Sequence, residues 1–292
     1  MKTKKYQIHK QIITFLVIFI TLSSTVYLWM FSSSEKNQLA IFVMMYIPGL
    51  SAILTTLYYR VGITKKQLRF GKWKIIFISY LLPLLVAFVA YGSSWLLNFT
   101  NFSTEQIVYN QWVDMLGFTL PAPLIISILS KIFLLSLLAV IFVFGEELGW
   151  SGFLTPKLRE ICSIKTTSIV VGIIWATWHF PAIIGGFYAE GIPLKFSLPG
   201  FIVVLTGVSF IRTLLLEKSN SIWVGVILHI SHNVFVMELF LELTAYKGNT
   251  YYFLSETGMV VGFVYIITAF VCYYILKKSK GIATNPNSLT LK

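Results

Sequence analysis

Residues 132–147 read IFLLSLLAVIFVFGEE, an almost wholly apolar run that ends in the adjacent carboxylates Glu146 and Glu147. With the residues before it, from about 123 and including Lys131, the run has the ~20 residues that a helix needs to cross ~30 Å of hydrocarbon. Two carboxylates at its end predict a helix that carries charge to the edge of a bilayer. This stretch therefore favours a membrane protein over a soluble one.

The composition of the whole chain supports the same interpretation. Hydrophobic residues make up 57% of the 292 residues and charged residues only 12%, with a mean hydropathy of +0.79. A soluble domain carries about twice that share of charge. We therefore predict an all-α, polytopic membrane helix bundle with eight spans, at about 11–31, 39–60, 75–97, 123–146, 166–184, 198–216, 221–241 and 258–276.

The distribution of positive charge gives the orientation of these spans. Lys and Arg concentrate in every second connection, whereas the other loops hold only Lys36, Lys195 and Lys247. Because short cytoplasmic loops are enriched in Lys and Arg, we predict a multi-pass protein of the cell membrane with both termini in the cytoplasm. The net charge of +12 is explained by these loops, and no basic stripe indicates a nucleic-acid partner.

The two ends of the chain and its cysteines add few constraints. The first apolar block follows four lysines and is too long for a signal-peptide core, so we expect it to be a retained span. Cys162 and Cys272 lie in unrelated segments and indicate neither a disulfide framework nor a metal site. We divide the chain into a three-span region with an outside loop (1–122), a membrane core (123–245), and a last span with a cytoplasmic tail (246–292).

Polar residues within the apolar blocks are the candidates for chemistry, because ionisable groups in hydrocarbon cost at least ~2.5–3.5 kcal/mol. Glu146 and Glu147 form either a water-exposed pair at a helix end or part of a packed site with a base and an orienting group. His179, in the segment WATWHFP at 175–181, is either a structural hydrogen-bond partner or a catalytic residue. Pro181 is expected to kink or loosen that helix.

A third polar group lies in the seventh span. His229, His232 and Asn233 stand at positions i, i+3 and i+4, so they share one helix face. They form either an interhelical hydrogen-bond clamp or part of a site. Further along the same helix, Glu238 and Glu242 are expected to be interfacial, since they approach the outer end.

Three of these groups can meet in one cavity in the cytoplasmic half of the membrane. Counted along the helices at 1.5 Å per residue, Glu146, His179 and His229 lie at compatible depths. One side of such a cavity would supply a base and a water molecule, and the other side would supply donors for an oxyanion. Arg212, near the inner end of the sixth span, is expected to extend its guanidinium to the interface.

At these residues the sequence resembles the family of CAAX prenyl endopeptidases and bacteriocin-processing proteins, which are intramembrane proteases. The family motifs are E-E-x-x-x-R, an aromatic residue followed by x-x-x-H, and H-x-x-x-N or D. They match Glu146-Glu147, Trp175 to His179, and His229 to Asn233, in order and on the expected helices. The resemblance covers about residues 130–245 and leaves His232 without a family position.

The resemblance implies a function and roles for these residues. It implies peptide hydrolysis by activated water, with Glu146 as the general base, His179 helping to position and deprotonate the water, and Glu147 orienting the pair. His229 and Asn233 would stabilise the oxyanion. The substrate would be a membrane-associated peptide of prenylated or bacteriocin type. No cofactor is required by this scheme, although zinc held by His179, His229 and Glu146 remains an alternative.

One departure from the family pattern leaves other functions open. Ser151 stands where the motif has arginine, so a neutral hydroxyl replaces a guanidinium. The chain then either uses another cation or has lost activity and serves as a non-catalytic immunity or assembly protein on the same scaffold. A proton-relay transporter is the third alternative, because buried ionisable groups also line such pathways.

Overall fold

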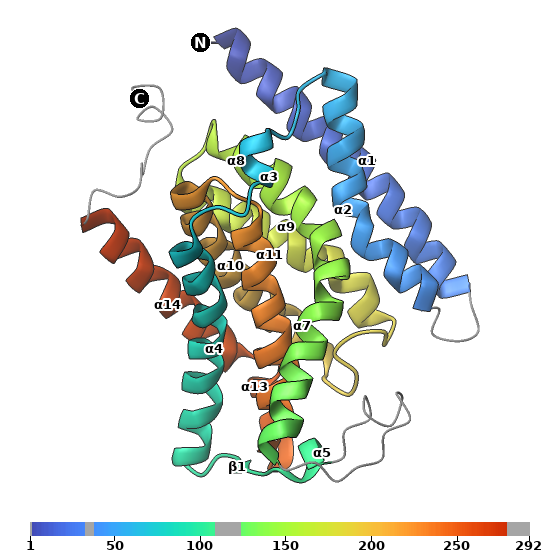
Figure 1. The fold of residues 1–292 in the computed structure, drawn as a ribbon. Helices are drawn as coiled ribbons and strands as arrows, with labels where there is room; N and C mark the ends of the chain where they lie inside the picture. Colours follow the sequence, from blue (N-terminus) through green and yellow to red (C-terminus); the bar gives the residue numbers. More distant parts are fainter. Residues whose placement is uncertain (1, 33–37, 109–123, 279–292) are drawn as a thin grey trace.

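The structure, a computed structural model, describes residues 2–32, 38–108 and 124–278, and it is built almost entirely from helices (Figure 1). Eight segments among these residues are long and apolar enough to cross a membrane, which confirms the predicted all-α polytopic bundle. The long helices are α1 (Lys2–Ser32), α2 (Gln38–Tyr59), α4 (Trp73–Leu96), α7 (Leu124–Gly149), α9 (Ile164–Ile184), α10 (Leu194–Ser219), α11 (Trp223–His232) and α14 (Met259–Lys278).

Short elements connect or extend these helices. Two π-helical segments continue long helices, η1 (Trp150–Leu154) after α7 and η2 (Asn233–Leu239) after α11, and each passes into a short α-helix. The remaining elements are α3 (Lys65–Leu68), α5 (Glu105–Val108), α8 (Thr155–Arg159), α12 (Phe240–Glu242), η3 (Gly248–Thr250) and α13 (Tyr251–Leu254), with the strands β1 (Asn101–Phe102) and β2 (Thr244–Ala245).

Helices α10 and α11 form the interior of the bundle. Helix α10 packs against α9 on one side and α14 on another, and α11 packs against α4 and α7. Helices α1 and α2 pack on one another and cover α7 and α9 from the outside. The polar residues of α7, α9, α10 and α11 therefore face one another in the middle of the molecule.

The crossing of α2 and α7 orients the carboxylate pair. Gly145 and Gly149 lie four residues apart on one face of α7, and that face is pressed against α2. A Cβ on Gly149 would lie 2.5 Å from the carbonyl carbon of Pro48, so only glycine permits this approach. Because Glu146 and Glu147 project from other faces of the same turn, the crossing directs both carboxylates into the bundle.

The helical segment that carries this pair does not end at the pair, contrary to the predicted boundary at residue 146. It continues through η1 and α8 as far as Arg159. Both carboxylates are buried, with exposed fractions of 2% for Glu146 and 0% for Glu147. The interpretation of a water-exposed pair at a helix end was therefore wrong, since the chain buries these charges with partners instead of releasing them to the interface.

The two ends of the bundle differ in structure. The start of α1 lies at the same end as α3 and α8, and α5 and β1 lie at the opposite end (Figure 1). Strands β1 and β2 pair antiparallel there, which the sequence did not predict. Helix α5 lies in the loop before α7, and residues 109–123 of that loop lie outside the described residues.

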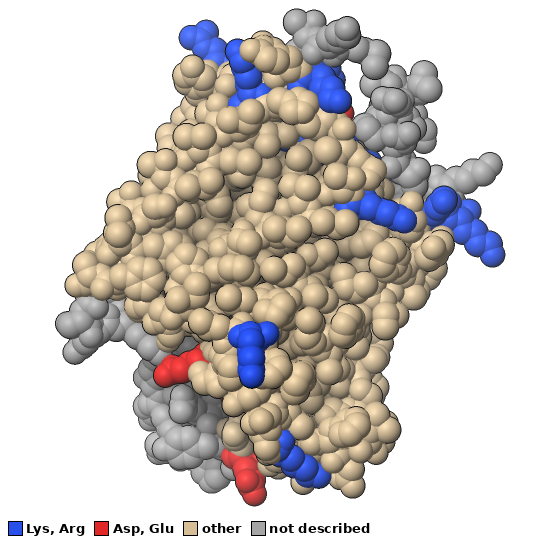
Figure 2. Space-filling view, turned by 180° about the vertical axis from the view of Figure 1, so that it is seen from behind, with Lys and Arg blue, Asp and Glu red and all other residues tan. Residues whose placement is uncertain are grey.

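The surface between the two ends is largely apolar. Charged side chains are few on the face shown in Figure 2 and lie mostly toward its two ends. Many large hydrophobic side chains are exposed along the long helices, such as Leu28 at 71% and Phe88 at 62%. Such a surface suits contact with lipid, and the chain is a multi-pass membrane protein. The three-region division remains a prediction.

Candidate active site

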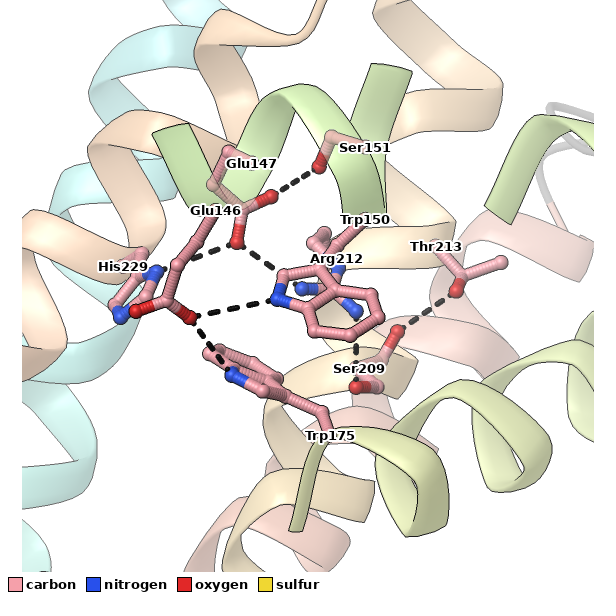
Figure 3. A network of polar contacts seen from close by, with 9 residues as sticks. All are labelled: Glu146, Glu147, Trp150, Ser151, Trp175, Ser209, Arg212, Thr213 and His229. Carbon is pink, nitrogen blue, oxygen red and sulfur yellow. Dashed lines mark hydrogen bonds and ion pairs between the residues drawn. The ribbon is translucent and has the colours of Figure 1, made fainter. Parts of the chain in front are cut away.

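Glu147 is held by three donors from three different helices (Figure 3). The Ser151 hydroxyl donates to Oε2, and Arg212 Nη1 donates to Oε1 over 3.0 Å. His229 Nδ1 lies 3.3 Å from the same Oε1. A fully buried carboxylate needs such partners, because an unpaired charge in this environment is strongly destabilising. Glu147 therefore acts as the anchor that joins α7, α10 and α11.

Glu146 is held differently, by two indole groups. Trp175 Nε1 donates to Oε2 over 3.0 Å, and Trp150 Nε1 donates to the same oxygen over 3.4 Å (Figure 3). The second oxygen, Oε1, makes no hydrogen bond with any described residue. No cation pairs with Glu146 among the described residues, so one carboxylate oxygen retains its capacity to accept a proton.

His179 and His229 have their Nδ1 atoms occupied and their Nε2 atoms unoccupied. His179 Nδ1 lies 3.0 Å from the carbonyl oxygen of Trp175, which can only accept, so Nδ1 carries the proton. His229 Nδ1 faces the Glu147 carboxylate, which requires the same tautomer. In both rings the lone pair of a neutral imidazole is then on Nε2, and Nε2 makes no hydrogen bond to a described residue.

Trp175 connects the predicted residues. Its indole nitrogen binds Glu146, its carbonyl oxygen binds His179, and its ring packs edge-on against the His229 ring at a centroid distance of 4.9 Å. The structure thus brings Glu146, His179 and His229 together around one residue, and Glu147 joins them through His229. The aromatic position of the second motif holds the site together, a role that sequence reasoning had not assigned to it.

Asn233 joins this group less directly. It lies one helical turn beyond His229, at the first position of η2, and is half-buried. Its amide makes no hydrogen bond with the residues that the structure describes. The side chain is therefore free to bind a ligand, although the structure shows no contact between Asn233 and the other predicted site residues.

Both carboxylate and imidazole motifs precede a π-helical segment. Segment η1 begins three residues after Glu147, and η2 begins directly after His232. A π-turn inserts an extra residue and changes the direction of the following side chains, which is why such segments are frequent at functional sites. Here η1 brings the Ser151 hydroxyl onto Glu147, and η2 begins at Asn233.

The environment of His179 includes a tyrosine from the loop after α9. The Tyr188 ring lies 5.7 Å from the His179 ring, centroid to centroid, and its hydroxyl approaches Met237 Sδ at 3.7 Å. Burial, followed by the charges of Glu256 and Glu146, raises the pKa of the Tyr188 hydroxyl well above its usual range. The phenol therefore remains a neutral donor beside His179 at any physiological pH.

Arg212 is the residue that sequence reasoning placed incorrectly. It does not extend to the interface but is fully buried, and its guanidinium stacks over the Trp175 ring at 4.8 Å from the ring centroid. The available signal was its place in an apolar helix next to Ser209, whose hydroxyl accepts from Nη2 over 3.1 Å. A snorkelling arginine and a buried one have the same sequence pattern, and only the fold separates them.

The other intramembrane charges lie apart from this site. Lys131, buried in α7, forms ion pairs with Glu242 and, over 3.6 Å, with Glu238. These three side chains neutralise one another between the first turns of α7 and the extension of α11. They are consistent with structural pairing, and the two glutamates are partly exposed, as an interfacial location requires.

The side chains do not fit the zinc alternative. Among the described residues, no group of three or more His, Cys, Asp and Glu is arranged to hold a metal ion. The atoms that zinc would use, the Nε2 atoms of His179 and His229 and Glu146 Oε1, have no partner among the described residues, but they are not grouped as a metal-binding set. We derive no catalytic step through a metal, and we expect chelation with 1,10-phenanthroline to leave peptide cleavage within twofold of the untreated rate.

His232 serves the packing of the bundle. Its Nδ1 lies 2.8 Å from the Tyr265 hydroxyl of α14, and both side chains are buried. We expect Tyr265→Phe to lower the free energy of unfolding by about 0.5–2 kcal/mol, because His232 loses its partner. The contacts of Glu146 and Glu147 do not involve this pair and should be unchanged. Tyr273→Phe on the same helix is the control, since its hydroxyl bonds to no described residue; equal thermal unfolding midpoints in the two variants would contradict this role.

Comparison with known proteins finds two similarities, and both concern part of the chain. Residues 127–235 match the family model described as "Type II CAAX prenyl endopeptidase Rce1-like". The chain is also 30% identical over 133 residues to a protein of Methanococcus maripaludis named CAAX prenyl protease 2, covering 44% of this chain and 45% of that protein. The chain therefore matches about half the length of this relative.

The matched segment contains every predicted site residue and Arg212, and it leaves out α1, α2, α4 and α14. The motif match, the buried carboxylate pair and the family model concern the same helices. Residues 127–235, less than half of the chain, are thus similar to the Rce1-like type II CAAX prenyl endopeptidases.

Proposed function

We propose that this chain is an intramembrane endopeptidase that hydrolyses a peptide bond of a membrane-associated, CAAX-like peptide with an activated water molecule. One observation carries the proposal. After all internal hydrogen bonds are made, Glu146 Oε1 and the Nε2 atoms of His179 and His229 are without partners among the described residues, and all three side chains contact Trp175. These are the acceptors that activation of water requires.

In the first step a water molecule is deprotonated and attacks the substrate. Glu146 Oε1 accepts a proton from the water molecule, while His179 Nε2 accepts the second hydrogen bond and fixes its direction. The oxygen then adds to the carbonyl carbon of the substrate. The indole donors on Glu146 Oε2 hold the carboxylate in place without neutralising it, since neither indole is a cation.

The second step stabilises and resolves the tetrahedral intermediate. His229 takes a proton from solvent at Nε2 before the water adds, donates it in a hydrogen bond to the oxyanion and keeps it throughout, while Glu147 stabilises that imidazolium through Nδ1. The Asn233 amide provides a further donor. Donors that are fixed before the reaction are worth about 10²–10³ in rate at comparable sites. The C–N bond then breaks, and the proton taken from water passes to the leaving amine.

The experiment that tests this proposal is a cleavage assay with the purified chain in detergent. A farnesylated C-terminal CAAX peptide and the same peptide without the farnesyl group are incubated with the protein, and mass spectrometry detects the released C-terminal fragment. We expect release from the farnesylated peptide. The Methanococcus relative, tested under the same conditions, serves as the positive control.

Two results would decide against parts of the proposal. Cleavage of the unmodified peptide at the same rate would leave endopeptidase activity but remove the preference for lipidated substrates, and would favour a bacteriocin-type peptide. Failure of the folded chain to cleave either peptide, while the relative cleaves the farnesylated one, would favour a non-catalytic role.

The orientation is part of the same proposal. The end that carries α3 and α8 is the end with most of the predicted inside Lys and Arg, so we place it in the cytoplasm of the cell, with the substrate approaching from that leaflet. Cys162, beside α8, should then react with a membrane-impermeant thiol reagent in inverted vesicles and not in intact cells.

A further inference from the structure

Arg212 is a fully buried cation, and its partners Glu147 and Trp175 belong to the proposed active site. It lies in α10, the interior helix, and reaches Glu147 through Nη1 over 3.0 Å. Glu147 is a neighbour of Glu146 in sequence and of His229 in space. A charged pair with exposed fractions of 1% and 0% gains little stability over apolar side chains of similar size, so its presence indicates another role.

The guanidinium is fixed on several sides. Nη2 donates to the Ser209 hydroxyl one turn earlier in α10, and Cζ lies over the Trp175 ring at 4.8 Å from its centroid. Nε alone has no partner among the described residues. A planar group that pairs and stacks at once is characteristic of arginine, and lysine cannot reproduce it.

Through these contacts Arg212 acts on both halves of the site. Its Nη1 shares the oxygen Oε1 of Glu147 with His229 Nδ1, so it fixes the carboxylate that directs His229 (Figure 3). Its stacking fixes the Trp175 ring, whose indole nitrogen donates to Glu146. Loss of the guanidinium would therefore release the proposed base and the proposed oxyanion donor together.

Ser151 stands at the position where the family motif has arginine, and the arginine that pairs with Glu147 comes from α10 instead. In the family motif quoted above, the position four residues after Glu147 carries arginine, but here the short Ser151 side chain bonds to Oε2 of the same carboxylate. Ser151 also lines a cavity of about 320 Å³, together with Thr155 and Thr213. A longer side chain at position 151 therefore has space.

We propose that Arg212 is the positioning cation of this site and replaces, from α10, the arginine that the motif carries on α7. This inference rests on the proposed function, and Arg212 is a positioning residue because it contacts neither water nor substrate in the scheme above. It also implies that the effects of substitutions at positions 151 and 212 depend on one another. One arginine is needed to pair with Glu147, and arginines at both positions would crowd the same carboxylate.

The test measures kcat, KM and the thermal unfolding midpoint in detergent for four variants: Arg212→Met, Arg212→Lys, Ser151→Arg/Arg212→Met and Arg159→Met. We expect Arg212→Met to lower kcat about 100-fold with little change in KM, because the catalytic groups lose their alignment. Arg212→Lys keeps the positive charge but lacks the planar guanidinium with its several donors, and its kcat should remain well below that of the wild type. The double variant should recover about tenfold of the lost kcat or more.

Arg159→Met is the matched control. It removes another buried arginine, which pairs with Glu217 over 2.6 Å and does not contact the proposed catalytic residues. It should lower the unfolding midpoint while the folded protein keeps its kcat.

Each outcome decides the proposal. A folded Arg212→Met protein with wild-type kcat would overturn it, and so would equal losses of kcat in Arg212→Met and Arg159→Met. If Arg212→Met does not fold, recovery of folding and cleavage by Ser151→Arg/Arg212→Met supports the coupling, and no recovery overturns it. If the wild-type chain itself cleaves no peptide, the proposed function fails first, and a restored unfolding midpoint in the double variant still tests the coupling separately.

Discussion

Replacement of Glu146 by glutamine is expected to lower kcat for peptide cleavage about 10³-fold, within the 10²–10⁴ that a positioned general base contributes. Glutamine has the same size and can still accept the indole hydrogen bonds of Trp175 and Trp150 through its amide oxygen. Its NH₂ group would then occupy the place of Oε1, the oxygen that takes the proton from water. The substitution removes the base and keeps the packing.

The assay compares initial rates and thermal unfolding midpoints of the wild-type and variant proteins in the same detergent. Glu160→Gln is the matched control, because it makes the same chemical change at a partly exposed residue that pairs with Lys157 and Lys4. We expect that control to cleave at the wild-type rate. A folded Glu146→Gln protein with a rate within tenfold of wild type would show that another group activates the water.

The sequence alone predicted the spans well, because length and hydropathy are local properties. An apolar run of ~20 residues has few alternatives in a membrane protein. The predicted span at 198–216 lies inside α10 (Leu194–Ser219), and the one at 75–97 nearly coincides with α4 (Trp73–Leu96). These boundaries differ by a few residues, as is usual where helices end in the interfacial region.

The boundary at Glu146 failed for a different physical reason. A prediction from hydropathy places the end of a span at the first carboxylates, because it counts the full free-energy cost of moving each carboxylate out of water. In the structure that cost is offset by donors from α9 and α10, which are far away in sequence. The helix consequently continues through η1 to Arg159, and the pair lies inside it.

The sequence could name the candidate site residues, but it could not give the contacts between them. The three motifs identify Glu146, His179 and His229, and depth arguments place them at compatible levels. Trp175 contacts both Glu146 and His229 only because α9 turns that face toward them. The sequence of a helix that is apolar on all sides does not show which face points inward. Arg212 depends in the same way on the rotation of α10.

A second substitution with a large expected effect is Gly225→Ala in α11. A methyl group on Gly225 would overlap the Ser151 hydroxyl oxygen and Glu147 Oε2. Neither atom can withdraw easily, because the hydroxyl is bonded to the carboxylate and the carboxylate is bonded to Arg212. We therefore expect α11 to be displaced from η1 and α7, with a loss of about 1–3 kcal/mol in the free energy of unfolding from overpacking.

The displacement would affect catalysis directly, because Gly225 and His229 are four residues apart and share a face of α11. Moving that face away from Glu147 lengthens the His229 Nδ1 contact, which is already 3.3 Å. A misplacement of about 1 Å can cost ~100-fold in rate, so we expect a loss of that size in kcat. Helix propensity alone predicts the opposite sign, since alanine favours a helix interior by about 1 kcal/mol over glycine.

Gly152→Ala provides the matched control within the same few turns of structure. A Cβ on Gly152 would have Ile63 Cδ1 as its nearest neighbour at 3.4 Å, followed by Leu148 Cδ1 at 3.6 Å, which are ordinary contacts. We expect this control to keep its kcat and to unfold at or slightly above the wild-type midpoint. A Gly225→Ala protein that also matches wild type in kcat and unfolding midpoint would mean that α11 does not approach the carboxylate pair closely, and the proposed alignment of His229 by Glu147 would be lost with it.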